Sequence, residues 1–157
     1  MANRNLRTQE SRPYAAPSDA GQALVETALI FPMLVALLIG AAEFARVAYA
    51  AIEVANAARA GVQYGAQSGA DASDSTGIAT AASNDGANVT GLVTTSSIAC
   101  ICSDGTASTC ANTDCASSHT EEILTVNTQA TIDPLIHVPG LPRTYTIKGK
   151  AIQKCVQ

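Results

Sequence analysis

The chain has 157 residues, of which 14% are charged and 4% are aromatic, and it contains no Trp. This length suggests one membrane segment and one small exported domain, and the shortage of large side chains limits the apolar area that the domain can bury. The net charge of −4 argues against nucleic acid as a partner, because phosphate binding requires clustered Lys and Arg.

Residues 1–21 are interpreted as a basic leader outside the fold. They are polar, include Pro13 and Pro17, show no apolar periodicity and carry three arginines ahead of an apolar run. Only Arg46 follows closely on the far side of that run. This asymmetry predicts that the N-terminus lies in the cytoplasm and that the rest of the chain is exported across the inner membrane.

Residues 22–67 are predicted to form one long helix. No charged residue occurs between Thr27 and Ala42, so about 22–42 is the expected membrane half, which exceeds the roughly 20 residues needed to span a bilayer. Pro32 removes a backbone donor and is predicted to kink this half. The outer half, 43–67, is expected to be amphipathic. Its predicted packing face consists of Phe44, Val47, Ala48, Ala51, Ala55, Ala58 and Val62.

A glycine precedes the apolar run and a glutamate lies five residues further on, in Gly21-Gln22-Ala23-Leu24-Val25-Glu26. A charged acid at the centre of a membrane helix costs about 2.5–3.5 kcal/mol. The presence of Glu26 near the start of the apolar run therefore indicates a functional role. The arrangement resembles the processing site of type IV prepilins. The resemblance implies cleavage after Gly21, and pairing of Glu26 with the cationic N-terminal amine of a neighbouring subunit.

The remainder is predicted to be a linker followed by a small β-rich head. Residues 68–90 are rich in small and polar residues, and a short helix capped by Ser75 or Thr76 and running through Ser83 is expected there. Alternating patterns predict strands at about 91–101, 123–132 and 144–151, with three prolines forcing a loop in 133–142. The expected fold class is α+β, with the long helix packed on a small antiparallel sheet in a disulfide-bonded head.

All five cysteines lie downstream of the apolar run, in the part expected to face an oxidising compartment. Cys100 and Cys102 share a strand face and should bond outward; the nested pairing Cys100–Cys115 and Cys102–Cys110 is one of three alternatives. Cys155 either replaces one of these four or stays free. A zinc site is the competing interpretation, but Cys-x-Cys is too tight for the usual tetrahedral pairs. We therefore expect no metal and no cofactor.

Residues 21–61 contain several markers at fixed places: Gly21, Val25, Glu26, Pro32, Glu43, Phe44, Arg46, Arg59 and Gly61. Together they look like the TadE-like domain of minor pilins, or pseudopilins, of tight-adherence (Tad/Flp) pili. The pattern of that family is a small residue with Val-Glu, a Leu-rich run containing Pro, Glu-Phe-Gly-Arg, and Ala-Ala-Arg-x-Gly.

Two departures from the pattern are compatible with a helix: Ala45 replaces the usual Gly, and Val62-Gln63 replaces Ala-Arg. Thr27 stands where major Flp pilins carry an aromatic residue, which favours a minor component. The resemblance implies other pilin subunits, the prepilin peptidase, the assembly platform and membrane lipid as partners. It implies an assembly role without catalysis or a small-molecule substrate.

Two other interpretations compete with the pilin. Ala48-Tyr49-Ala50 fits a signal-peptidase site, which would release a secreted domain, although Glu43 and Arg46 interrupt the approach to it. The chain could instead be a static membrane-anchored or secreted adhesion domain that never enters a pilus. No motif supports an enzyme.

Overall fold

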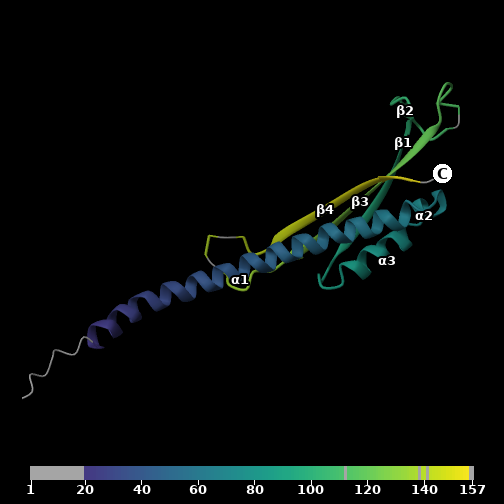
Figure 1. Cartoon of the computed structure of the whole chain (residues 1–157). Coiled ribbons are helices and arrows are strands. Elements are labelled where there is room, and N and C mark those ends of the chain that lie inside the picture. The colour runs from purple at the N-terminus through teal and green to yellow at the C-terminus, as the bar shows by residue number, and fades with distance from the viewer. Residues whose placement is uncertain (1–19, 112, 138, 141, 156–157) are drawn as a thin grey trace, which may run out of the picture. The chain divides into compact units, whose positions relative to one another are not determined.

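The computed structural model describes residues 20–111, 113–137, 139–140 and 142–155 (Figure 1). The predicted leader therefore lies outside the described residues up to position 19. The chain divides into two units, Met1–Gly40 and Ala41–Gln157. The elements in chain order are α1 (Ala20–Gly65), α2 (Gly69–Ser73), α3 (Ser75–Asp85), β1 (Val93–Cys102), β2 (Ala107–Ser108), β3 (Thr120–Ile132) and β4 (Tyr145–Lys154). This confirms the predicted α+β class.

The described part of the first unit is helical. All residues from 21 to 40 are exposed, and α1 is long and apolar enough to cross a membrane. The hydroxyl of Thr27 donates to the carbonyl of Ala23 at 2.8 Å, which satisfies this polar group within the helix itself. The helix assignment continues through Pro32, and the kink there stays a prediction.

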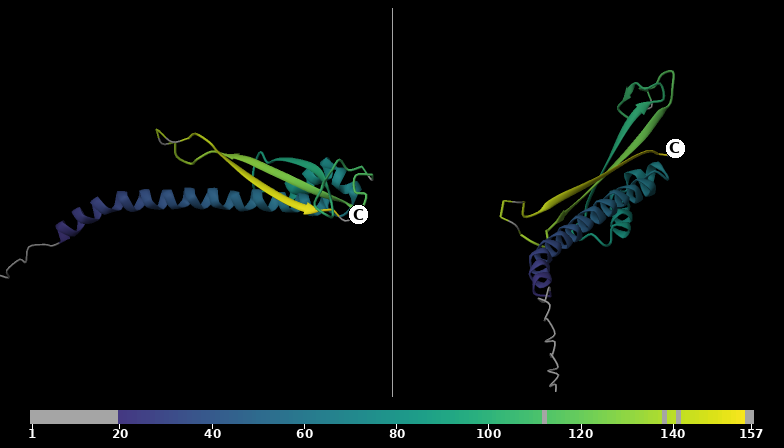
Figure 2. Two further views of the ribbon diagram at one scale, coloured as in Figure 1. Left: turned by 90° about the horizontal axis from the view of Figure 1, so that it is seen from above. Right: turned by 60° about the vertical axis from the view of Figure 1, so that its left-hand side comes forward.

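The second unit contains a four-stranded antiparallel sheet in the order β2-β1-β3-β4. In both views of Figure 2, β4 (yellow) lies beside β3. Residues at the centre of the sheet are in register across three strands: Val126 of β3 is opposite Ser96 of β1 and Ala151 of β4. As the alternation predicts, Leu124 and Val126 are buried while Asn127 and Gln129 are exposed.

The core of the second unit lies between the sheet, the outer part of α1 and α3. Val62, Ile78, Leu124 and Val126 form one buried cluster, with Tyr64, Ala151 and Cys155 packed against it. Elements distant in sequence are tied together by a buried hydrogen bond, in which the Thr128 hydroxyl donates to the carbonyl of Val54 at 2.7 Å.

The buried face of α1 is rotated from the predicted one. Of the predicted face, only Ala58 and Val62 are buried, and Phe44 is 77% exposed. At 3.6 residues per turn, the observed face lies about one-fifth of a turn away. It consists of Ala50, Val54, Ala57, Ala58, Gly61, Val62, Gly65 and Ala66.

Close packing explains this rotation. A Cβ on Gly65 would overlap the side chain of Leu124, and one on Gly61 would lie 3.2 Å from Cγ1 of Val126. The sheet therefore approaches the helix where Gly61 and Gly65 leave room, whereas the predicted face included Phe44 and Val47 and left both glycines out.

The segment 68–90 contains two helices. Ser68 caps α2 by accepting from the amide of Asp71 at 3.1 Å, and Asp74 caps α3 by accepting from the amide of Gly77 at 2.9 Å. The expected helix is present, but its cap is Asp74 and not Ser75 or Thr76, so it begins at Ser75 and extends to Asp85. Its fully buried Ile78 belongs to the core, so this segment contributes to the packed head.

Candidate functional site

The residues of the proposed processing site lie on α1 and are all exposed. A Cβ on Gly21 would meet no atom within 4 Å, so packing within the chain gives no reason for a glycine there. Among the described residues, no hydrogen bond or ion pair involves the carboxylate of Glu26. Contacts among the described residues therefore explain neither Gly21 nor Glu26.

Glu43, in contrast, connects two parts of the second unit. Its Oε2 accepts from Nη1 of Arg46 at 3.3 Å and from the backbone amide of Leu135 at 3.1 Å. The other oxygen, Oε1, is buried and has no hydrogen-bond partner among the described residues. Glu43 thereby binds the loop between β3 and β4 to the helix, although Glu43 and Leu135 are far apart in the sequence.

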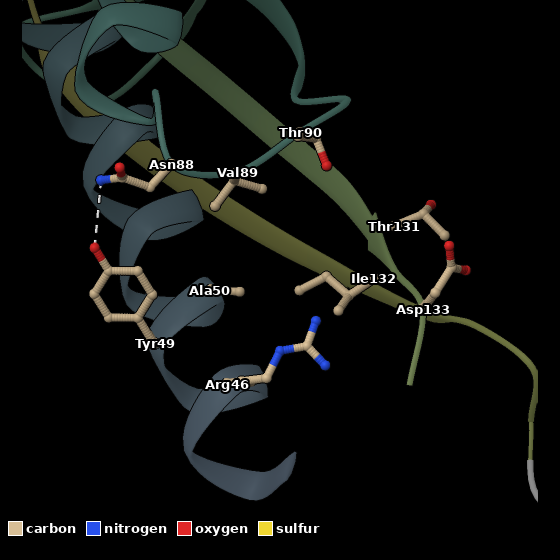
Figure 3. Close-up of a pocket in the computed structure, with 9 residues that line it drawn as sticks. All are labelled: Arg46, Tyr49, Ala50, Asn88, Val89, Thr90, Thr131, Ile132 and Asp133. Carbon is tan, nitrogen blue, oxygen red and sulfur yellow. Dashed lines mark hydrogen bonds between the residues drawn. The ribbon is translucent and has the colours of Figure 1, made fainter. Parts of the chain in front are cut away.

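Arg46 lies next to a cavity of about 300 Å³ (Figure 3). The amide nitrogen of Asn88 donates to the hydroxyl of Tyr49 at 3.3 Å along one side of it. The nearby carboxylate of Glu53 raises the pKa of Tyr49 above its ordinary value, because it favours the protonated hydroxyl and its charge opposes the phenolate. The cavity is lined by Arg46, Tyr49, Ala50, Asn88, Val89, Thr90, Thr131, Ile132 and Asp133. Glu43 offsets the positive charge of Arg46 at its edge.

The second half of the motif has one structural residue and one surface residue. Nη1 of Arg59 donates to Oδ1 of Asn56 at 3.4 Å on the exposed side of the helix. Gly61 is buried where α1 approaches the sheet and α3. Its conformation is helical, so the need for glycine comes from space and not from backbone freedom.

Two disulfides join the distal part of the head. They link Cys100 to Cys110 and Cys102 to Cys115, so Cys100 and Cys102 do bond outward, but the nested pairing is wrong. The unpredicted strand β2 explains the difference. Cys100 is in register with Ser108, which brings Cys110 beside it and leaves Cys102 to reach the more distant Cys115.

Cys155 is free and half-buried. Burial raises the pKa of its thiol, and the nearby charge of Glu122 acts in the same direction. Its backbone amide donates to the carbonyl of Glu122 at 2.9 Å. Within the described ranges, no cluster of three or more His, Cys, Asp or Glu side chains could hold a metal ion.

Sequence reasoning missed three contacts that shape the head. The first is the bond between Glu43 and the amide of Leu135. The second is the packing role of Gly65, which the four-residue spacing from Gly61 could have indicated. The third is the approach of Gly149 to α1, where an added Cβ would lie 2.5 Å from the carbonyl oxygen of Val54. A glycine within a strand pattern is a recognised sign of such an approach.

The comparison with protein families agrees with the motif analysis. The family model described as TadE-like protein matches residues 21–63. This match begins at Gly21 and includes Glu26, Glu43, Arg46 and Gly61. No curated protein and no solved structure matches the chain. The helical segment 21–63 is therefore TadE-like, as its motifs predicted.

Proposed function

We propose that this protein is a minor pilin or pseudopilin that takes part in assembling or priming a tight-adherence pilus. One observation carries the proposal: the TadE-like match begins at Gly21, and the apolar helix that follows is exposed from residue 21 to residue 42. Such a surface requires lipid or other subunits to cover it. A pilin meets both, first in the membrane and then in the filament.

Glu26 is proposed to act between subunits. Its carboxylate has no internal partner in the described chain, and cleavage after Gly21 would create a cationic amine at Gln22. The two charges would be attracted most strongly where lipid or packed helices exclude water. The pair would then fix the register of an incoming subunit against its neighbour.

The orientation follows from the charges and the disulfides. Three leader arginines favour a cytoplasmic N-terminus, and two disulfides in the head fit an oxidising compartment beyond the membrane. Prepilin peptidase, other pilin subunits and the assembly platform are the partners that this role requires. An inner-membrane protein whose head is exported, and which later enters an extracellular pilus, satisfies all of these features.

Processing can be tested by determining the N-terminus of the protein from membranes, using intact mass and peptide mapping. We expect a start at Gln22 that is lost when the prepilin peptidase is deleted. Gly21→Val should block this cleavage, while Gly40→Val should leave it unchanged. A Cβ at either glycine meets no atom within 4 Å, so neither change strains the chain.

A protein that starts at a residue other than Gln22 would overturn the proposed cleavage after Gly21. An intact Met1 would indicate a fixed anchor. A start at Ala51 would indicate a secreted domain, although Ala50 is buried within an uninterrupted helix.

The assembly role can be tested with Glu26→Gln, which keeps the size of the side chain and removes its charge. We expect loss of pili, or of association with the assembly machinery, at normal protein level. Thr27→Val is the matched control, because it alters an adjacent polar residue whose hydroxyl bonds only within its own helix. Unchanged piliation in Glu26→Gln would favour the static adhesion domain.

A further inference from the structure

We propose that the loop between β3 and β4 is a second membrane contact, in which Leu135 and Ile136 enter the surface of the outer leaflet beside the point where α1 leaves the bilayer. This inference rests on the proposed membrane-spanning role of α1. It adds to that role a lipid-binding surface on the head itself.

The hydrogen bond between the amide of Leu135 and the carboxylate of Glu43 fixes the position of this loop. Glu43 is the first charged residue after the apolar run, and its carboxylate accepts from the amide of Leu135 at 3.1 Å. The preceding residue, Pro134, is buried against the head. Leu135 is therefore held next to the residue at which the helix is expected to leave the hydrocarbon.

The chemistry of the loop suits a lipid surface. Leu135 is 58% exposed and Ile136 is 50% exposed, and no Asp, Glu, Lys or Arg occurs from Pro134 to Pro142. Phe44, one residue beyond Glu43 on α1, is 77% exposed. Exposed aliphatic and aromatic side chains near the end of a membrane helix are typical of groups that enter the interfacial layer.

Lipid is a better occupant than a second copy of the chain. The amide of Leu135 in this loop is hydrogen-bonded to Glu43, the residue that directly follows the uncharged run of residues 27–42. Lipid is therefore the nearest apolar phase to this loop in any single inserted molecule. A second copy would have to bring a complementary apolar face to the same level.

The absence of Trp from the natural sequence makes a direct test available. Ile136→Trp would be introduced into the full chain, reconstituted in phosphatidylcholine vesicles, and its fluorescence compared with and without lipids brominated on their acyl chains. The matched control is Ile152→Trp, because Ile152 is 57% exposed and lies on β4 within the head. Phe31→Trp reports on the apolar run itself.

We expect brominated lipid to quench Ile136→Trp at least twofold and to leave Ile152→Trp nearly unchanged, with Phe31→Trp quenched most strongly. Equal responses of Ile136→Trp and Ile152→Trp, with Phe31→Trp quenched, would overturn the loop contact and leave the membrane helix intact. A blue-shifted Ile136→Trp emission that depends on protein density and not on brominated lipid would assign the surface to a second copy. Failure to quench Phe31→Trp would overturn the membrane-spanning role together with this inference.

Discussion

The two units of this chain share the helix α1 but use it in opposite ways. From residue 21 to residue 40 every residue is exposed, including large apolar ones such as Leu29 and Leu38. Beyond Ala41 the same helix buries Val54 and Ala57 completely, while charged residues such as Arg59 and apolar ones such as Phe44 and Ile52 stay exposed. The first part therefore buries no side chain within the described residues, whereas the second is stabilised by contacts within its own chain.

The family motif divides in the same way. Gly21 and Glu26 contact nothing in the described chain that accounts for their identity. Glu43 and Gly61, in contrast, hold the β3–β4 loop and admit the sheet, respectively. A single stretch of TadE-like sequence thus combines exposed residues that have no internal partner among the described residues with residues that build the head.

The largest contrast between the two units is expected from removing a leucine side chain. Leu124 is fully buried, so Leu124→Ala should lower the free energy of unfolding by about 2–5 kcal/mol. Leu37 is 62% exposed, and Leu37→Ala should change it by no more than about 0.5 kcal/mol. Chemical denaturation of the full chain in detergent measures both; equal losses would break the comparison.

The disulfides should give the next largest effect. Replacing Cys102 and Cys115 with Ser should destabilise the head by about 2–4 kcal/mol, since this bond closes the longer loop. Cys155→Ser should have little effect, because that thiol is unbonded. Thermal unfolding tests the stabilities. Peptide mapping of the oxidised protein tests the pairing. A Cys100–Cys115 linkage would contradict the observed pairs, Cys100 with Cys110 and Cys102 with Cys115.

A glycine packed between helix and sheet and a glycine on the exposed part of α1 should respond oppositely to an added methyl group. Gly149→Ala places a carbon against the backbone of Val54 and the hydroxyl of Thr128, and should destabilise the head by about 1–3 kcal/mol. Gly40→Ala meets no atom and should stabilise the helix by about 0.5–1 kcal/mol. Unfolding midpoints compare them, and tolerance of Gly149→Ala would show that the sheet can move away from α1.

Acidification should have the smallest effect and should be confined to the head. The amide of Gly77 and then the hydroxyl of Tyr64 hold the pKa of Asp74 below its ordinary value. A depressed folded-state pKa adds stability above the unfolded value of about 3.9, and this is lost as pH falls through the folded pKa.

Asp74→Asn keeps a capping side chain and removes the titration. The fall in melting temperature between pH 6 and pH 3 should therefore be smaller in this variant than in the natural protein. The same fall in both would show that Asp74 does not contribute. Asp104, Asp114 and Glu121 also have lowered pKa values, so only the difference between the two proteins is informative.

The sequence predicted those features that depend on neighbouring residues. The length and polarity of α1 follow from a long run of helix-compatible residues in which Pro32 is the one exception. The faces of β3 follow from alternation, with Leu124 and Val126 inward and Asn127 outward. The sequence predicted Ser75 or Thr76 as the N-cap of α3, and the structure has Asp74 in that position. Local sequence could not separate them, because Asp, Ser and Thr are all competent N-caps.

What the sequence alone determined is the apolar helix, the α+β class and the TadE-like motif, because each is written in local spacing and composition. Only the tertiary structure decided the buried face of α1, the disulfide pairing and the bond from Glu43 to the amide of Leu135. These three depend on which surfaces approach closely in space. Gly61, Gly65 and Gly149 set the approach of sheet and helix and so the buried face of α1, whereas the register of β1 with β2 sets the disulfide pairing.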